Sequence, residues 1–286
     1  MKLVSYNIQY GIGLDQKYDL DRIAASLAGA DIIALQEVTR NFARNGYADL
    51  VAGLEARFPE HFSCFHAPVD LLLNMERREG RVVAHRLQFG NMILSRHPIL
   101  SVRGLLLPRS RTYDRLNLQR SALEAVIATP EGPLRVYSVH LDHISPEERL
   151  GQIAVLQRLL ADTPQEGVAV TGADEFGMGD TPAPEDYVAL GDFNLQPESP
   201  EYQALFGRPD PFYGRVPRRT HPVDALAHLK KRAAGSYSWE GPGGAGERLL
   251  LDYALVSPSL LPRLADARID TAARGSDNFP LWVELS

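Results

Sequence analysis

The sequence VALGDFN, residues 188–194, gives the clearest indication of the fold. Its first three residues form a short apolar run, which is typical of a strand buried on both faces. The run leads into Asp192 and Asn194, so an acid and an amide follow directly after the predicted strand. In sheet-and-helix folds, sites are built at strand ends and in the loops that follow them. GDFN alone is also compatible with a simple Asx-type turn.

Four other apolar runs end at, or contain, a polar residue of the same kind. They are residues 2–6 before Asn7, residues 32–35 before Gln36 and Glu37, residues 134–140 ending in His140, and residues 249–256 around Asp252. A single polar residue at a strand end needs no explanation, because every strand ends. Five that are all Asn, Glu, His or Asp are less easily explained in that way, and they favour a functional site.

Glu37 and Asn7 are candidates for a metal site. Carboxylate oxygens suit hard cations such as Mg²⁺ or Mn²⁺, and an amide oxygen can complete such a shell. The alternatives are that Glu37 is a solvated strand end and Asn7 a turn residue.

His140 and Asp252 stand out for different reasons. His140 is followed by Asp142 and His143 in SVHLDH, so a neighbouring acid is available to orient an imidazole. A lone histidine is more often structural. Asp252 interrupts the apolar run LLLDYALV, and a carboxylate there is costly to bury unless it is paired. We therefore expect a fixed partner for Asp252.

The remaining pattern predicts further strands and helices. Strands are expected at residues 90–95, 121–128 and 281–285, with 121–128 and 134–140 forming a hairpin. Helices are expected from Asp19 onward, over residues 47–58, after Pro146 and near residues 224–231. Residues 66–89 are predicted to be a long loop or excursion, residues 172–186 a solvated loop, and residues 207–247 irregular.

Composition excludes several classes of protein. The chain has 286 residues, of which 44% are hydrophobic and 23% charged, and this rules out a largely disordered or fibrous protein. The net charge of −6 argues against a general nucleic-acid coat protein. Cys64, the single cysteine, excludes an intramolecular disulfide framework and fits a reducing compartment. No apolar run reaches roughly 18 residues, and the N-terminus lacks the apolar block of a signal peptide. We therefore expect a cytoplasmic protein without stable membrane association.

Taken together, these segments resemble the endonuclease/exonuclease/phosphatase superfamily, the Mg²⁺-dependent phosphoesterases that include deoxyribonuclease I and AP endonucleases. The resemblance covers nearly the whole chain and runs in order through Asn7 in SYNIQYG, Gln36-Glu37, GNMILSRHPI, SVHLDH with Arg149 and Gln152, GDFN, LDYALVS and SDNFP. It implies an α/β (α+β) fold, a four-layer sandwich of two packed mixed β-sheets flanked by helices. It further implies one domain over residues 1–286, with the site at one end of the sandwich.

The resemblance also implies roles for individual residues. Asn7 and Glu37 would bind Mg²⁺ or Mn²⁺, with Asp277 close to the metal. His140, Asp192 and Asn194 would contact the phosphate and position the water. The implied reaction is in-line hydrolysis of a phosphate ester.

One position departs from the family pattern. In the family, Asp252 would orient the histidine of a Ser-Asp-His motif, but this sequence reads Ser276-Asp277-Asn278. An amide accepts no proton near neutral pH, so Asn278 cannot be a general base, and loss of such a group commonly costs about 10²–10⁴ in rate. Three explanations stay open: an engineered substitution that traps an inactive form, a natural variant that acts slowly, or a member that binds phosphate ligands without catalysis.

The substrate is less well defined than the reaction. Two basic stretches indicate an electropositive rim for an anionic substrate, or simply solvated loops: Arg96, Arg103, Arg109, Arg111, Arg115 and Arg120, and then Arg215, Arg218, Arg219, Lys230, Lys231 and Arg232. Phe212, Tyr213, Tyr237 and Trp239 lie in the second stretch, and aromatic residues among bases suit stacking on nucleobases. We expect a phosphodiesterase or nuclease-like enzyme with a phosphorylated substrate, nucleic acid among the candidates. The alternatives are a phosphomonoesterase for a small metabolite or inositol phosphate, and a phosphate-ligand binder. The oligomeric state stays open.

Overall fold

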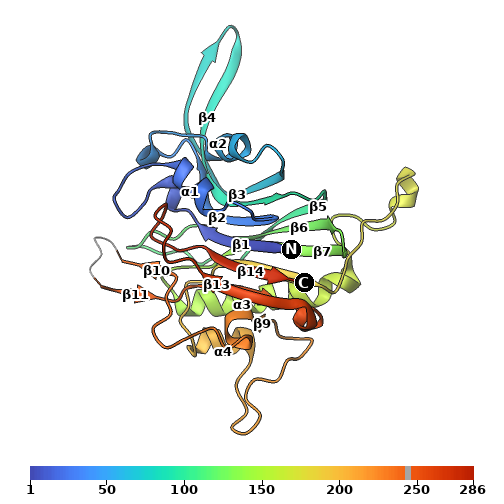
Figure 1. Ribbon diagram of the computed structural model, residues 1–286. Helices are drawn as coiled ribbons and strands as arrows, with labels where there is room; N and C mark the ends of the chain where they lie inside the picture. Colours follow the sequence, from blue (N-terminus) through green and yellow to red (C-terminus); the bar gives the residue numbers. More distant parts are fainter. Residues whose placement is uncertain (242–245) are drawn as a thin grey trace.

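The computed structural model describes residues 1–241 and 246–286. Two six-stranded β-sheets pack face to face (Figure 1). The first contains, in spatial order, β13 (Leu264–Ile269), β14 (Leu281–Leu285), β1 (Lys2–Asn7), β2 (Ile32–Arg40), β4 (Arg81–Ser95) and β3 (Phe62–Arg78). The second contains β5 (Ile99–Leu106), β6 (Ser121–Thr129), β7 (Gly132–His140), β8 (Tyr187–Asp192), β12 (Asp252–Val256) and β9 (Val223–Asp224).

Both sheets are mixed, because β1 pairs in parallel with β2 and β7 with β8, while antiparallel pairs flank them. A further two-stranded sheet joins β10 (Trp239–Glu240) to β11 (Arg248–Leu249). The helices are α1 (Leu20–Ser26), α2 (Leu50–Arg57), α3 (Pro146–Glu166), α4 (Pro200–Phe206) and α5 (Ala225–His228), with short 3₁₀ turns at Gln9–Gly11, Ala43–Asn45, Ala173–Phe176 and Pro258–Arg263.

Helices cover the outer face of each sheet, and this confirms the predicted four-layer sandwich (Figure 1). Apolar side chains alternate along each strand, so one set meets the other sheet and the next set meets a helix layer. Leu3 and Ile32 pack between the sheets against Leu190. Val4 and Ile33 face the other way and pack with the residues of α1 and α2. The second sheet packs in the same manner against α3 and α4.

The predicted helix starts are confirmed by their caps. Asp19 precedes α1 and accepts hydrogen bonds from the backbone amides of Asp21 and Arg22. Ser145 caps α3 in the same way, and Pro146 occupies its first turn. These caps fix where each helix begins, and with it the loop that precedes it.

Residues 66–89, predicted as a long loop or excursion, form instead a long β-hairpin. β3 and β4 stay paired as far as Arg78 and Arg81, and the hairpin projects from the body at the top of Figure 1. The prediction of a loop was wrong because this ribbon has no buried face. Leu72 and Met75 are exposed, so no alternation of apolar and polar residues marks the strands.

Other boundaries also differ from the predictions. β2 does not stop at Glu37 but bulges there and continues to Arg40. The run 249–256 divides between β11 and β12, which belong to different sheets. β5, β13 and α4 were not predicted, and Tyr47 lies outside α2 and is exposed. Part of the predicted irregular stretch, residues 242–245, lies outside the described residues.

Among the helices that the structure describes, none is long and apolar enough to cross a membrane.

Candidate active site

Three predicted site residues lie side by side at the ends of three neighbouring strands of the second sheet, β7, β8 and β12. The parallel pairing of β7 with β8 sets His140 opposite Asp192, and the antiparallel pairing of β12 sets Asp252 opposite Asp192. All three side chains are buried. The strand register therefore builds this half of the site.

Gly191 makes this register possible. A Cβ atom at Gly191 would lie 1.9 Å from the carbonyl oxygen of Val139 on the neighbouring strand. Real side chains do not tolerate such a contact, so β7 and β8 can approach this closely only with glycine here. Close packing between β7 and β8 thus explains the glycine of the GDFN motif.

The first sheet supplies Asn7 and Glu37 to the same place. The side-chain amide nitrogen of Asn7, at the end of β1, donates to Glu37 Oε1 at 3.3 Å and to Asp192 Oδ2 at 3.0 Å. Glu37 sits in the bulge of β2 with a φ of 58°, a backbone conformation that is unusual for this residue type. The neighbouring Gln36 donates to Ser138 Oγ of the second sheet at 2.9 Å. Polar side chains therefore join the two sheets at the site.

Asn278 bridges two carboxylates. Its side-chain nitrogen donates to Asp252 Oδ2 at 2.8 Å and to Asp192 Oδ2 at 3.3 Å. Asp252 thus has the fixed partner that its burial required, and Ser238 Oγ accepts a hydrogen bond from its backbone amide at 2.9 Å.

Asp277 is held by two groups that the sequence did not indicate. Gln9 Nε2 donates to Asp277 Oδ2 at 2.7 Å, and the indole nitrogen of Trp239 donates to the same atom at 3.1 Å. Ser276 Oγ donates to the other carboxylate oxygen at 3.2 Å. The sequence pattern indicates Trp239 only as a stacking aromatic in a basic stretch.

Burial raises the pKa of four carboxyl groups in this cluster. The pKa of Glu37 rises to about 7, through burial first and then the charge of Asp277. Burial, followed by the charge of Asp192, holds the pKa of Asp252 well above its ordinary range. Burial also raises the pKa of Asp192 and Asp277. A cluster of this kind favours a bound cation, which would stabilise the ionised forms.

Arg120 lies near the charges of Glu37 and Asp192, whereas the sequence placed it in a stretch expected to be an electropositive rim or a solvated loop. It is only 4% exposed. One guanidinium nitrogen lies 2.9 Å from His143 Nδ1, while its Nε and Nη1 are buried without a hydrogen-bond partner. The sequence signal that could have placed Arg120 at the site is its position directly before Ser121, which pairs with His140 on the neighbouring strand.

His140 is neutral near pH 7. Its burial, together with the positive charges near it at Arg120 and His143, lowers its pKa well below the ordinary value. Its Nε2 lies 3.9 Å from Asp192 Oδ2, too far for a hydrogen bond, and its Nδ1 is buried without a partner. Neither ring nitrogen of His140 therefore has a hydrogen-bond partner among the described residues.

The expectation that Asp142 orients an imidazole is wrong. Asp142 Oδ2 accepts from the backbone amides of Ile144 and Ser145, and this fixes the turn that leads into α3. Arg149, quoted with the same motif, forms an ion pair with Glu201 at 2.7 Å. Gln152 accepts from the Asp142 amide at 2.8 Å. These residues shape the loop after β7 rather than the reaction centre.

Asn194 lies next to the cluster, and its backbone amide and its side-chain nitrogen already make hydrogen bonds within the protein. Its backbone amide donates to Asp192 Oδ1 at 3.0 Å, and its side-chain nitrogen donates to the carbonyl oxygen of Leu141 at 3.1 Å. It orients Asp192 in this arrangement.

The donor set fits a hard divalent cation. Glu37, Asp277 and Asn7 carry the oxygen atoms that Mg²⁺ prefers, and Gln9 Oε1 beside them is buried without a partner. Within residues 1–241 and 246–286, no three His, Cys, Asp or Glu side chains form a metal cage by themselves. Mg²⁺ does not need one, since it usually keeps several waters and takes only one or two carboxylates. The nitrogen of Asn7 faces Glu37, so its oxygen can bind a metal only after the amide rotates.

A family model described as "Endonuclease/Exonuclease/phosphatase family" matches residues 4–277. No curated protein matches the sequence. Among solved structures, an endonuclease/exonuclease/phosphatase from Beutenbergia cavernae is similar with a TM-score of 0.66 and 18% identity, over 100% of this chain and 72% of that chain.

Two further solved structures carry functional names. The 3′ phosphatase NExo from Neisseria, a point variant bound to a product DNA hairpin, has a TM-score of 0.60 and 20% identity, over 100% of this chain and 99% of that one. A mannosyl-6-phosphatase from Bacteroides thetaiotaomicron has a TM-score of 0.61 and 18% identity, also over 100% and 99%. At these identities the likeness shows the fold.

Proposed function

We propose, from the premise that this chain belongs to the endonuclease/exonuclease/phosphatase family, that it is a divalent-metal-dependent hydrolase of phosphate esters. The observation that supports this proposal is that acidic side chains and an unpaired arginine guanidinium lie together in one site. Glu37 and its neighbouring carboxylates favour a cation, while the guanidinium of Arg120 has two buried donors without a partner, which an anion would satisfy. A metal ion with a phosphate ester satisfies both.

Glu37, Asn7 and Asp277 would hold the metal, and Mg²⁺ or Mn²⁺ is the ion that these oxygen donors suit best. When bound, the ion would neutralise phosphate charge and lower the pKa of water.

Arg120 and His140 would bind the phosphoryl oxygens. The free Nε and Nη1 of Arg120 match the planar, two-point hydrogen bonding that arginine makes to phosphate. His140 is neutral and so donates one hydrogen bond without adding a charge. Donors fixed in a buried site stabilise the charge that develops on the phosphoryl oxygens in the transition state.

Asp192 would orient the attacking water and accept its proton. Its two oxygens are held by three groups, namely Asn194 at Oδ1 and Asn7 and Asn278 at Oδ2. These donors favour the ionised carboxylate, which the role of base requires. Asn278 acts here as a positioning residue, since its amide keeps Asp192 and Asp252 in place but takes no proton.

This assignment favours an active enzyme over a phosphate-ligand binder, because Asn278 keeps hydrogen bonds to both carboxylates. Between substrate classes we propose a phosphodiester first, with nucleic acid among the candidates. A phosphomonoester is the second candidate, since two similar structures are named as phosphatases. The single domain over residues 1–286, the cytoplasmic location and the absence of stable membrane association stay predictions.

The test is hydrolysis of bis(p-nitrophenyl) phosphate and of p-nitrophenyl phosphate, each with Mg²⁺, Mn²⁺ or EDTA. We expect turnover of at least one substrate with a metal and none with EDTA. Glu37→Gln removes a proposed metal ligand and should abolish turnover, whereas Glu55→Gln on the exposed face of α2 should leave it unchanged. Turnover that persists in EDTA would overturn the proposal.

A further inference from the structure

The buried guanidinium of Arg120 is held by a histidine. Within the described residues it makes one hydrogen bond, from Nη2 to His143 Nδ1 at 2.9 Å. A guanidinium carries only donors, so Nδ1 of His143 must be the acceptor in this bond. His143 is therefore neutral in this arrangement, with its ring proton on Nε2.

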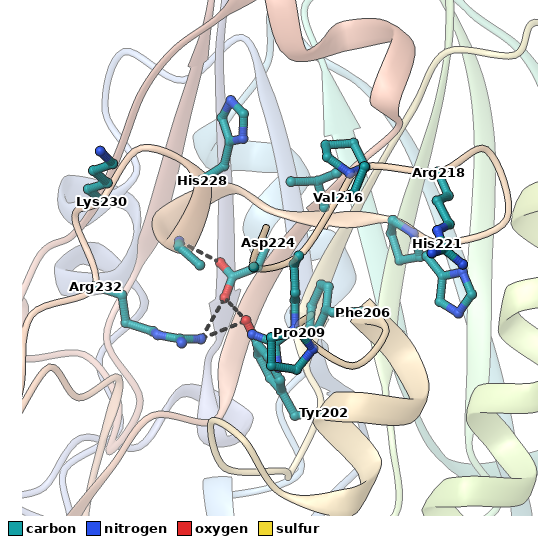
Figure 2. A pocket seen from close by; sticks show the side chains of 16 residues that line it. Tyr202, Phe206, Pro209, Val216, Arg218, His221, Asp224, His228, Lys230 and Arg232 are labelled. Atoms are coloured by element: carbon teal, nitrogen blue, oxygen red, sulfur yellow. Dashed lines mark hydrogen bonds and ion pairs between the residues drawn. The ribbon is translucent and has the colours of Figure 1, made fainter. Parts of the chain in front are cut away.

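Other arginines with little exposed surface are held differently. Three arginines whose side chains are at most 20% exposed each pair with a carboxylate at 2.7 to 3.1 Å, namely Arg103 with Glu124, Arg149 with Glu201, and Arg232 with Asp224. Figure 2 shows the last of these pairs. In the described part of the chain, no carboxylate hydrogen-bonds to Arg120, since Nε and Nη1 have no partner and Nη2 binds His143. A neutral imidazole thus holds Arg120 without neutralising its charge, and that charge stays available to an anion.

The loop after β7 fixes the position of His143. The backbone amide of Asp142 donates to Gln152 in α3 at 2.8 Å, and Arg149 donates to the carbonyl oxygen of Asp142 at 3.3 Å. Asp142 Oδ2 also accepts from the two backbone amides that follow His143. These contacts hold the chain on both sides of His143 against the start of α3. The SVHLDH segment, together with Arg149 and Gln152, thereby places an imidazole against Arg120.

We propose that His143 is a positioning residue, which holds Arg120 for phosphate binding and releases it on taking up a proton. This inference rests on the proposed function, in which Arg120 binds phosphoryl oxygens. The bond to His143 occupies Nη2 and leaves Nε and Nη1, the two donors assigned to the phosphate. In a protonated His143 both ring nitrogens carry hydrogen, so Nδ1 no longer accepts and the imidazolium repels the guanidinium. Phosphate binding should therefore weaken at acidic pH.

The surroundings of His143 suit this role. His143 is exposed to solvent, so a proton can reach it although Arg120 is buried. Partial burial of its ring, and then the charge of Arg120, lowers the pKa of His143. The carboxylate of Asp142 opposes this shift, and the guanidinium of Arg149 adds to it. The lowered pKa keeps His143 neutral, and thus an acceptor, at neutral pH.

The kinetic test uses metal-dependent hydrolysis of bis(p-nitrophenyl) phosphate. His143→Ala removes the acceptor and should lower kcat/KM at neutral pH by about tenfold or more, as expected for a lost hydrogen bond to a charged group. His143→Asn should retain most of the activity, because an amide Oδ1 can accept in place of Nδ1. His228→Ala changes an exposed histidine at the end of α5 and is the matched control, which should leave kcat/KM unchanged.

The pH profile separates this role from a merely structural one. Asparagine does not titrate, so kcat/KM of the unchanged protein should fall more steeply below about pH 6.5 than that of His143→Asn. The other titratable groups of the site are common to both proteins, so the ratio of the two profiles isolates His143. Parallel profiles would overturn the release of Arg120 by protonation.

Long-range ¹H–¹⁵N NMR of the metal-free protein tests the contact without turnover. The signals of His143 are assigned by their absence from His143→Asn. At neutral pH they should show a proton on Nε2 and none on Nδ1. A proton on Nδ1 would overturn the proposal, because that nitrogen could not then accept from Arg120.

The kinetic outcomes distinguish this proposal from the proposed function. Turnover that His143→Ala leaves unchanged would overturn the positioning role alone, and so would a loss in His143→Ala that His143→Asn shares in full. No turnover by the unchanged protein with either metal would overturn the proposed function, and with it a role for His143 in phosphate binding.

Discussion

Asn278 donates its side-chain amide to Asp252 at 2.8 Å, where the family pattern has a histidine. The same nitrogen also reaches Asp192 at 3.3 Å. An amide holds two buried carboxylates in place as a hydrogen-bond donor, but it cannot carry a proton between them. In the proposed mechanism Asn278 therefore positions the two carboxylates, and the role of proton acceptor falls to Asp192.

Asn278→Ala should destabilise the protein. The substitution leaves Asp252 and Asp192 buried without this donor, and loss of a hydrogen bond to a buried charged group costs about 1–3 kcal/mol. Urea denaturation at neutral pH measures the change. Gln203→Ala in α4 removes an exposed side-chain hydrogen bond, to the carbonyl oxygen of Glu198, and serves as the control with a smaller loss. Equal losses in the two variants would contradict the bridging role.

The metal-free protein should lose stability as the pH rises from about 5 to about 7. Glu37 has an ordinary pKa of 4.5 that burial raises to about 7, so the folded chain binds more protons than the unfolded chain in this range. Stability falls with pH wherever the folded state binds more protons, here by up to about 3 kcal/mol. Urea denaturation in EDTA at several pH values gives the slope of the unfolding free energy against pH. Glu37→Gln should flatten it, and an unchanged slope in that variant would show that Glu37 is not its source.

Arg120→Met should lower kcat/KM for a phosphodiester by about 10²-fold or more, since it removes the two unpartnered donors that the proposal assigns to the phosphate. Arg115→Ala changes an exposed arginine of the same basic stretch and should have little effect. Because the methionine removes a buried charge, circular dichroism must show that the variant is folded. A folded Arg120→Met with normal kinetics would exclude Arg120 from phosphate binding.

His140 should not titrate between about pH 6 and pH 7.5, because burial and nearby positive charge lower its pKa well below the ordinary value. The proton shifts of its imidazole, assigned by comparison with His140→Gln, measure this directly. A midpoint near 6.5 would mean that the ring is more solvated than the structure indicates.

Gly191→Ala should be strongly destabilising, since the added Cβ would meet the carbonyl oxygen of Val139 at 1.9 Å. Forced overpacking of this kind costs about 1–3 kcal/mol or more. Gly151→Ala is the control, because that helical glycine has open space at its Cβ and alanine favours the helix by about 1 kcal/mol. Thermal unfolding should show a lower Tm for Gly191→Ala and a higher Tm for Gly151→Ala than for the unchanged protein.

Much of the fold was predictable because its signals are local. The apolar run before Asp192 identifies a buried central strand, and Asp19 and Pro146 mark where two helices start. The hairpin of β3 and β4 was not predictable in this way. Its strands project from the body, so burial imposes no pattern on residues such as Leu72.

The site was predictable in its residue types but not in its pairings. Asn7, Asp192 and Asn278 were identified individually, yet the hydrogen bonds that join them span separations of up to 185 positions along the chain. Arg120 was missed for the same reason, because a charge in a basic stretch gives no sign that tertiary packing will bury it. Asp142 was assigned to an imidazole on adjacency alone, while the backbone of the next turn was the nearer donor.

The most direct test compares the protein with its Asn278→His variant in Mn²⁺- and Mg²⁺-dependent hydrolysis of bis(p-nitrophenyl) phosphate. The account predicts metal-dependent turnover by the protein with Asn278 in place, at a rate within about tenfold of the variant, because Asp192 accepts the proton in both. Turnover that appears only in Asn278→His, or that rises there by about 10²-fold or more, would contradict it. That result would mean that the catalytic base is missing from this chain.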